Sequence, residues 1–260
     1  MFGKKACIMG GMLVIICCPA FSQPSGSSGN ETRPSFTFTE NVRLAIAWGE
    51  QLKPPAQYPR ALINLKEALV KYLNAPVVLD NQFRLGSSDL MKLSVAFITT
   101  DEQFELTETE KKNLREYIKK GGMVVVDNAA ANIPNSRAGA ALKQLVKDIA
   151  GAGRLQSIPN THPIYTTPFK LGGPPQGLDT AMTRIGIKVG SDGRVYESKV
   201  IADEARTLEG VFVNDRLTVL YSPKGYTAKW NSIENDPQLK FGVNIVVYAV
   251  THKSSGTQKE

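Results

Sequence analysis

The chain has 260 residues and a formal net charge of +7, from 31 lysines and arginines against 24 aspartates and glutamates. This length allows one large or two small domains, and it is enough to bury a core without disulfide bonds. The positive charges are scattered and no motif interleaves basic with aromatic residues, so nucleic-acid binding is not indicated, whereas a modest attraction to anionic envelope polymers is allowed.

Residues 1–22 have the three parts of a secretory signal peptide. A positive start (Lys4, Lys5) is followed by an apolar stretch up to Cys18 and by a small–any–small triplet that ends at Ser22. The apolar stretch is shorter than the roughly 20 residues of a membrane-spanning helix. We therefore expect cleavage after Ser22 and a mature protein in the periplasm or outside the cell; an uncleaved anchor is the alternative.

All cysteines of the chain lie inside this predicted signal peptide: Cys7, Cys17 and Cys18. The mature protein then has 3 − 3 = 0 cysteines, which excludes a disulfide bond, a thiolate nucleophile and a cysteine-ligated metal. Its two histidines, His162 and His252, lie far apart in the sequence and form no metal-binding motif. We expect no metal and no other cofactor.

The segments that flank the domain differ from it in composition. Residues 23–37 are rich in Ser, Gly and Pro and predict a flexible linker, whereas residues 253–260 predict a polar tail. Between them, residues 38–252 form the expected α/β domain. Its first half alternates between strands predicted at 42–48, 76–79, 94–98 and 123–127 and helices predicted at 60–73, from 107 to 120, and at 138–150.

The helix after Thr107 has the clearest boundaries. Thr107 and Glu110 have the spacing of a capping box, in which each side chain satisfies a backbone N–H of the other residue. Gly121 and Gly122 can take the left-handed conformation that ends helices. An apolar run follows at once and ends at Asp127, the pattern of a buried parallel strand.

Beyond Gly151 the pattern changes. A long loop contains His162, residues 184–189 predict a strand, and residues 211–213 and 217–220 predict a β-hairpin around a polar turn. A closing helix is predicted at 239–250. The whole order predicts a Rossmann-like or flavodoxin-like, mostly parallel sheet with helices on both faces, plus a C-terminal hairpin and closing helix.

Four stretches within about 42–251 resemble an uncharacterised bacterial family, domain of unknown function 4159. They are residues 108–127, Asn64-Leu65, His162-Pro163-Ile164-Tyr165 and residues 242–249. The family is similar to class I glutamine amidotransferases, and the resemblance therefore implies their Rossmann-like fold. It implies no known reaction.

The sequence departs from the amidotransferase pattern at the nucleophile. Those enzymes need a cysteine on a tight turn after a strand, with a histidine base and an acidic partner. Here the region after Ile98 reads Thr99-Thr100-Asp101-Glu102, and the pair of acids that often ends the next strand is reduced to Asp127 followed by Asn128. No catalytic residue is assigned.

Candidate ligand-binding residues follow from the topology, because α/β proteins bind ligands at the carboxyl ends of parallel strands. We expect the principal concave site there, around Trp48, Thr100, Asp127 and Asn128. An aromatic groove for sugars or peptides, using Trp48, Tyr58, Tyr226 and Trp230, is a further hypothesis, with core packing as its alternative. With a loop histidine added, the candidates are Trp48, Glu50, Thr99, Thr100, Asp127, Asn128, His162 and Tyr226.

Three functions fit these features. The missing nucleophile favours a non-catalytic, extracytoplasmic interaction module whose partner is an envelope protein or an anionic envelope polymer. The second is an envelope hydrolase that uses Asp127 and His162 in acid–base chemistry. The third is a binder of carbohydrate or peptidoglycan fragments.

Overall fold

The computed structural model describes residues 36–38, 40–151, 153–181, 183–201 and 207–253. The predicted signal peptide, most of the linker and the end of the tail lie outside the described residues. The chain divides into residues 1–32 and 33–260, and all described residues belong to the second unit. No helix in the described ranges combines the length and the apolar character that a membrane crossing needs.

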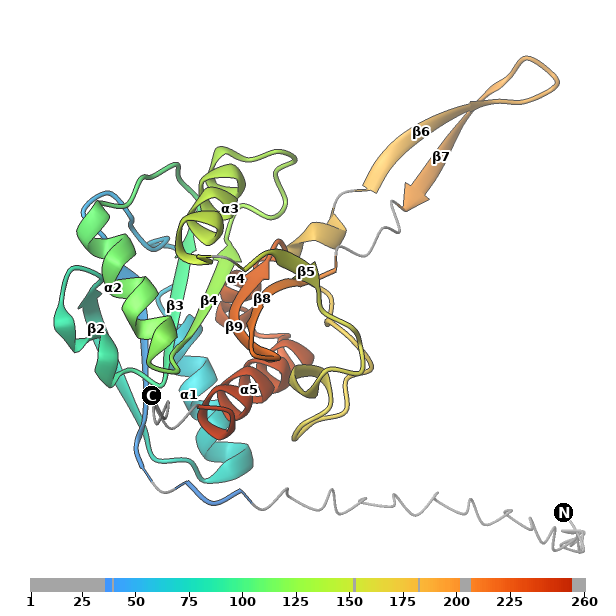
Figure 1. Ribbon diagram of the computed structural model, residues 1–260. Helices are drawn as coiled ribbons and strands as arrows, with labels where there is room; N and C mark the ends of the chain where they lie inside the picture. The colour runs from blue at the N-terminus through green and yellow to red at the C-terminus, as the bar shows by residue number, and fades with distance from the viewer. Residues whose placement is uncertain (1–35, 39, 152, 182, 202–206, 254–260) are drawn as a thin grey trace, which may run out of the picture. The chain divides into compact units, whose positions relative to one another are not determined.

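A seven-stranded sheet forms the centre of this unit (Figure 1). Its first five strands are parallel, and the last two pair antiparallel to their neighbours. The prediction of a mostly parallel α/β sheet is confirmed. In spatial order the strands are β2 (Val77–Arg84), β1 (Val42–Trp48), β3 (Val95–Thr100), β4 (Met123–Asn128), β9 (Arg216–Ser222), β8 (Glu209–Val213) and β5 (Leu155–Ser157).

Helices cover both faces of the sheet, as predicted. Successive residues of a strand point to opposite faces, so Leu44 and Phe97 contribute to one apolar core and Ala45 and Ala96 to the other. The first core is closed by α1 (Ala61–Leu73), α4 (Tyr226–Asn231) and α5 (Asp236–Thr251), and the second by α2 (Glu108–Lys119) and α3 (Arg137–Ile149).

Local sequence signals set several of these boundaries. The Thr107–Glu110 capping box is present at the start of α2. The hairpin of β8 and β9 turns at Asn214 and Asp215, whose φ angles of 49° and 61° are those of a tight two-residue turn. Asn and Asp tolerate this left-handed conformation better than most residues.

The long loop after β5 is fastened to α5 by a fully buried amide. Asn244 accepts a hydrogen bond from the Phe169 N–H at 2.9 Å and donates to the carbonyls of Phe169 and Ile164 at 2.8 and 3.1 Å. This holds the segment that contains the short 3₁₀ helix η2 (Pro163–Tyr165). A side chain in the middle of an apolar helix thereby orders a loop about 80 residues away.

Several elements were not predicted. They are the short strand β5, the strand β7 (Val195–Ile201), the helix α4 and the 3₁₀ helices η1 (Ser88–Lys92), η2 and η3 (Leu178–Ala181). Strand β7 pairs with β6 (Thr183–Val189) in a two-stranded antiparallel sheet of their own. Strand β2 is longer than predicted, and its pairing with β1 shifts register between Ala45 and Ala47.

Candidate functional site

The sheet brings the predicted strand-end residues to one edge. Thr99 lies beside Asp127 in the β3–β4 pair, and Asp127 lies beside Ser222 in the β4–β9 pair. Trp48 ends β1, the other neighbour of β3. The strand order reverses between β1 and β3, which makes this edge the usual place for a ligand in open α/β sheets.

Asp127 is fully engaged inside the protein. Its side chain accepts hydrogen bonds from the N–H of Tyr226 at 3.0 Å, the N–H of Thr227 at 2.7 Å and the Thr227 hydroxyl at 2.8 Å, and the residue is only 3% exposed. Burial raises the pKa of Asp127, whereas the hydrogen bonds from Thr227, Ser222 and Tyr226 oppose that rise.

These bonds make Asp127 the cap of α4. The residue before that helix, Gly225, has a φ of 69° and no side chain that could cap the free N–H groups. A carboxylate from the neighbouring strand replaces the missing cap and also complements the positive end of the helix. In the structure, this carboxylate therefore has a structural role as the cap of α4.

A second buried charge pair lies next to this cap. Lys224 Nζ contacts Asp179 Oδ2 at 2.9 Å, and the two side chains are 2% and 3% exposed. The Leu178 N–H donates to the Lys224 carbonyl at 2.7 Å, and the Tyr226 hydroxyl donates to the Pro175 carbonyl at 2.7 Å. Together they hold residues 175–179 against the loop between β9 and α4. Burial raises the pKa of Tyr226 well above its ordinary value.

The remaining candidates of β3 and β4 are buried. Asn128 accepts a hydrogen bond from the Ala130 N–H at 3.1 Å, and the Thr100 hydroxyl accepts one from the Glu102 N–H at 3.1 Å, so both shape the turns that follow their strands. The Thr99 hydroxyl is buried and has no hydrogen-bond partner among the described residues. None of the three presents a side chain to solvent.

Glu50 is exposed and belongs to a loop that crosses the switch point. Its N–H donates to Glu110 at 2.8 Å, the Gln57 amide donates to Asp101 at 2.7 Å, and Gln51 accepts from the Glu105 N–H at 3.2 Å. These contacts tie the loop after β1 to the loop after β3. The crevice between the two strand ends is thereby bridged by protein.

Trp48 lines an open cavity of about 290 Å³ beside this bridge. Tyr58 and three prolines share its wall: Pro54, Pro55 and Pro59. The other two members of the predicted aromatic groove, Tyr226 and Trp230, are buried in the core, where Trp230 packs edge-on against Phe97. The prediction of a groove lined by all four aromatic residues was therefore wrong. Two of them, Trp48 and Tyr58, line a smaller cavity. The four predicted edge residues also divide, because Trp48 reaches this cavity while Thr100, Asp127 and Asn128 are buried.

His162 lies near the amino ends of the parallel strands, whereas Asp127 lies at their carboxyl ends. It precedes η2, its Nδ1 accepts from the Ile164 N–H at 3.3 Å, and its ring packs against Tyr248 with 5.0 Å between ring centres. Burial lowers the pKa of His162 to about 4, with a further contribution from the charge of His252. The pKa shift and the contacts fit a neutral packed histidine.

The separation of the two hydrolase candidates can be estimated along β9. The Tyr248 hydroxyl accepts from the Leu217 N–H at 2.9 Å, near the start of β9, whereas Asp127 pairs with Ser222 at its end. Five residues of strand span about 16 Å at roughly 3.3 Å per residue. Asp127 and His162 therefore lie beside opposite ends of β9, and among the described residues no hydrogen bond joins them.

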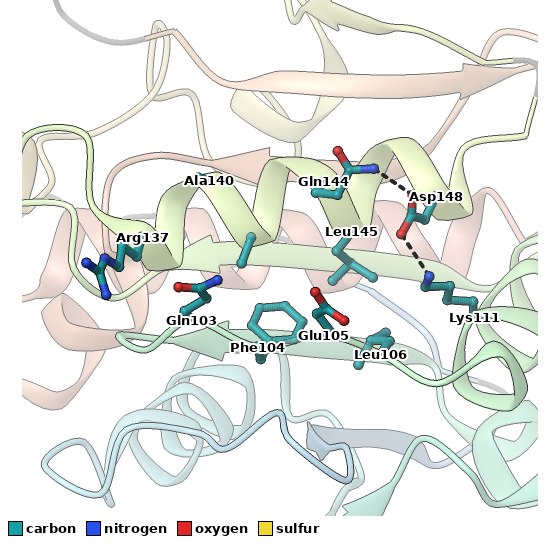
Figure 2. A pocket seen from close by; sticks show the side chains of 11 residues that line it. Gln103, Phe104, Glu105, Leu106, Lys111, Arg137, Ala140, Gln144, Leu145 and Asp148 are labelled. Atoms are coloured by element: carbon teal, nitrogen blue, oxygen red, sulfur yellow. Dashed lines mark hydrogen bonds and ion pairs between the residues drawn. The ribbon is translucent and has the colours of Figure 1, made fainter.

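A groove of about 590 Å³ lies on the face of the sheet that α2 and α3 cover (Figure 2). The extended segment 103–106 forms one wall and α3 the other. Phe104 and Leu145 lie between Arg137 at one end and the Lys111–Asp148 pair at the other. Neither Arg137 nor this groove was predicted. An arginine at the start of a helix is common, and the segment 103–106 has no recognisable motif.

Metal binding has no support in the described part of the chain, where no three His, Cys, Asp or Glu side chains gather in a way that could hold an ion.

Together, fold and site define a flavodoxin-like α/β domain whose strand-end acid caps a helix and whose open cavities flank the switch point. The chain belongs to the DUF4159 family, a domain of unknown function, whose profile matches residues 46–250. No curated protein matches it. Among solved structures, a ThuA-like protein from Bacteroides uniformis ATCC 8492 is 14% identical, with 85% of this chain and 97% of that chain covered and a TM-score of 0.44.

Proposed function

We propose that this protein is an exported, non-catalytic binding module built on a degenerate amidotransferase-like fold. The observation that carries the proposal is the state of Asp127, the acid at the centre of the sheet edge. Its carboxylate accepts three hydrogen bonds from the first turn of α4. A group used in this way has no free oxygen for a substrate, and its movement would uncap the helix.

The chain offers no replacement for the missing machinery. After the predicted signal peptide it has no cysteine, so the thiolate that attacks amides in amidotransferases is absent. The threonines at the end of β3 are buried, and His162 packs against Tyr248, whose hydroxyl contacts the other end of β9. The parallel order β2-β1-β3-β4-β9 supports the amidotransferase-like part of the proposal, because that order is the flavodoxin-like one.

Export is supported by the sequence of residues 1–22 alone. The intact mass of the protein recovered from the cell envelope or medium decides it. A chain that begins at Gln23 supports the proposal, whereas a chain that still contains Cys17 and Cys18, or one that carries lipid at Cys18, contradicts it.

The binding function can be tested with soluble peptidoglycan fragments. The immobilised protein is incubated with a mixture of fragments, washed and eluted, and the eluate is analysed by mass spectrometry. Fragments that are retained and returned with unchanged mass support a non-catalytic binder. Pairs of smaller products whose summed mass exceeds that of the parent fragment by one water, or amidated fragments whose amide has become a carboxylate with release of ammonia, contradict it, because they have been hydrolysed.

A carbohydrate ligand is the second candidate, and the Trp48 cavity favours it. Trp48 and Tyr58 are the side chains on which a sugar ring could stack, and Asp80 also lines this cavity as a hydrogen-bond acceptor. A thermal shift with oligomers of N-acetylglucosamine that disappears in Trp48→Ala would support this function through mass action. The absence of a thermal shift at millimolar oligomer would contradict carbohydrate binding.

A further inference from the structure

We propose that the groove between residues 103–106 and α3 binds a short peptide in extended conformation, with the peptide's terminal carboxylate at Arg137. This inference rests on the proposed binding function and names its site and ligand class. It starts from the unequal ends of the groove.

One end carries a free cation. Arg137 begins α3, and its guanidinium makes no hydrogen bond or ion pair with any described residue. The cation at the other end, Lys111, is already neutralised by Asp148 at 3.2 Å (Figure 2) and by Glu108 at 3.0 Å. A guanidinium presents a planar pair of donors that matches a carboxylate. An anionic ligand group therefore belongs at the Arg137 end.

The middle of the groove suits a peptide. Residues 103–106 alternate, with Phe104 and Leu106 buried and Gln103 and Glu105 exposed, as in an extended strand. The apolar side chains and Leu145 form a floor for one apolar ligand side chain.

Polar groups of the walls match the peptide backbone. Gln144 donates to Asp148 at 2.8 Å, which leaves its amide oxygen as an acceptor, and Gln103 offers both a donor and acceptor. Glu105 has no hydrogen-bond or ion-pair partner for its carboxylate among the described residues, and it can receive an ammonium group. Opposite free charges at Arg137 and Glu105 favour a ligand with both charges over a polyanion.

The part of the groove between Arg137 and Gln144 sets the size of the ligand. From Arg137 to Gln144 the helix advances about 10.5 Å at roughly 1.5 Å per residue. That is the length of about three extended residues. A tripeptide with an apolar central residue and free ends fits these dimensions.

The test uses the purified full chain and the tripeptide Ala-Leu-Ala in isothermal titration calorimetry. The comparator is its C-terminal amide, which is neutral and keeps one of the two acceptor oxygens. We expect the amide to bind about tenfold more weakly, as the loss of a charge-assisted hydrogen bond implies. Arg137→Gln should lower the affinity for the free acid to that of the amide.

Lys147→Gln is the matched control, because Lys147 is an exposed cation of the same helix that does not line the groove. It should bind the free acid as the wild type does. Equal binding of acid and amide, equal effects of the two substitutions, or no binding at millimolar peptide would each overturn the inference.

The state of the peptide after the titration separates this inference from the proposed function. Peptide that is recovered intact and did not bind would contradict the groove as a peptide site, and the proposal of a non-catalytic module with another ligand would stand. Peptide recovered as hydrolysed fragments removes the proposed function itself. Binding of an N-acetylglucosamine oligomer that Arg137→Gln abolishes would assign the groove to a saccharide instead.

Discussion

Replacing Asp127 with asparagine separates a structural carboxylate from a catalytic one. Asparagine keeps one acceptor oxygen, which can serve the N–H and hydroxyl of Thr227. Its amide NH₂ then faces the N–H of Tyr226, where the wild type has an accepting oxygen at 3.0 Å. One charge-assisted bond is lost and two donors oppose each other, while the cost of burying a charge disappears.

The expected loss of stability follows from these terms. A hydrogen bond to a charged group contributes about 1.5–3 kcal/mol, and relief of charge burial offsets part of it. We expect Asp127→Asn to lower the free energy of unfolding by about 2 kcal/mol, and Asp127→Ala, which removes every acceptor, by about 3–4 kcal/mol. For a domain of this size a loss of 2 kcal/mol lowers the melting temperature by roughly 4–8 °C.

Urea denaturation followed by circular dichroism measures these losses. Asp101→Asn is the matched control, because Asp101 lies at the same sheet edge but is exposed, and among the described residues its side chain bonds only to Gln57. It should change the free energy of unfolding by less than about 0.5 kcal/mol. An Asp127→Asn variant as stable as this control would show that the carboxylate does not hold α4.

Three further predictions concern stability. Lys224→Met should cost about 3–5 kcal/mol, because it leaves the buried carboxylate of Asp179 unpaired, and adding Asp179→Leu should recover most of the loss in chemical denaturation. The wild type should lose stability as the pH falls from about 6.5 toward 4, because burial lowers the pKa of His162 to about 4 and only the unfolded chain takes up the proton in that range. His162→Gln should flatten that part of the plot of unfolding free energy against pH, and an unchanged plot would contradict a packed histidine. Gly122→Ala should lower stability by about 1–3 kcal/mol, because a Cβ there would collide with the buried ring of Tyr117; a neutral effect in thermal denaturation would refute the contact.

The fold was largely readable because its signals are local. The apolar stripe of α1, the capping box of α2 and the polar turn between β8 and β9 each lie within a few residues of one another. Strands β3 and β4 are buried on both faces and read as continuous apolar runs, as parallel strands do.

The site was harder to predict because its contacts are distant in sequence. Asp127 bonds to residues 99 and 100 positions away, and α4 is a six-residue helix without a capping side chain of its own. Sequence reasoning placed Asp127 at the correct edge and kept a structural role open, but its partners had no signal. Lys224 and Asp179 are 45 positions apart in polar segments, so nothing marked them as a buried pair.

The aromatic hypothesis failed for a related reason. A tyrosine or tryptophan has the same sequence signature whether it lines a groove or fills a core. Tyr226 and Trp230 lie in α4, and their burial depends on contacts of α4 with other elements, such as Tyr226 with Phe241 of α5 and Trp230 with Phe97 of β3.

The most direct test of the proposed function is amide turnover by the purified protein. Release of ammonia from glutamine and from amidated muropeptides is measured for the wild type and for Asp127→Asn, at a temperature where circular dichroism shows both to be folded. We predict that the two proteins give the same rate and that this rate equals the buffer background. Turnover by the wild type well above background that is lost in Asp127→Asn would show that the protein is an enzyme and that its strand-end carboxylate takes part in catalysis.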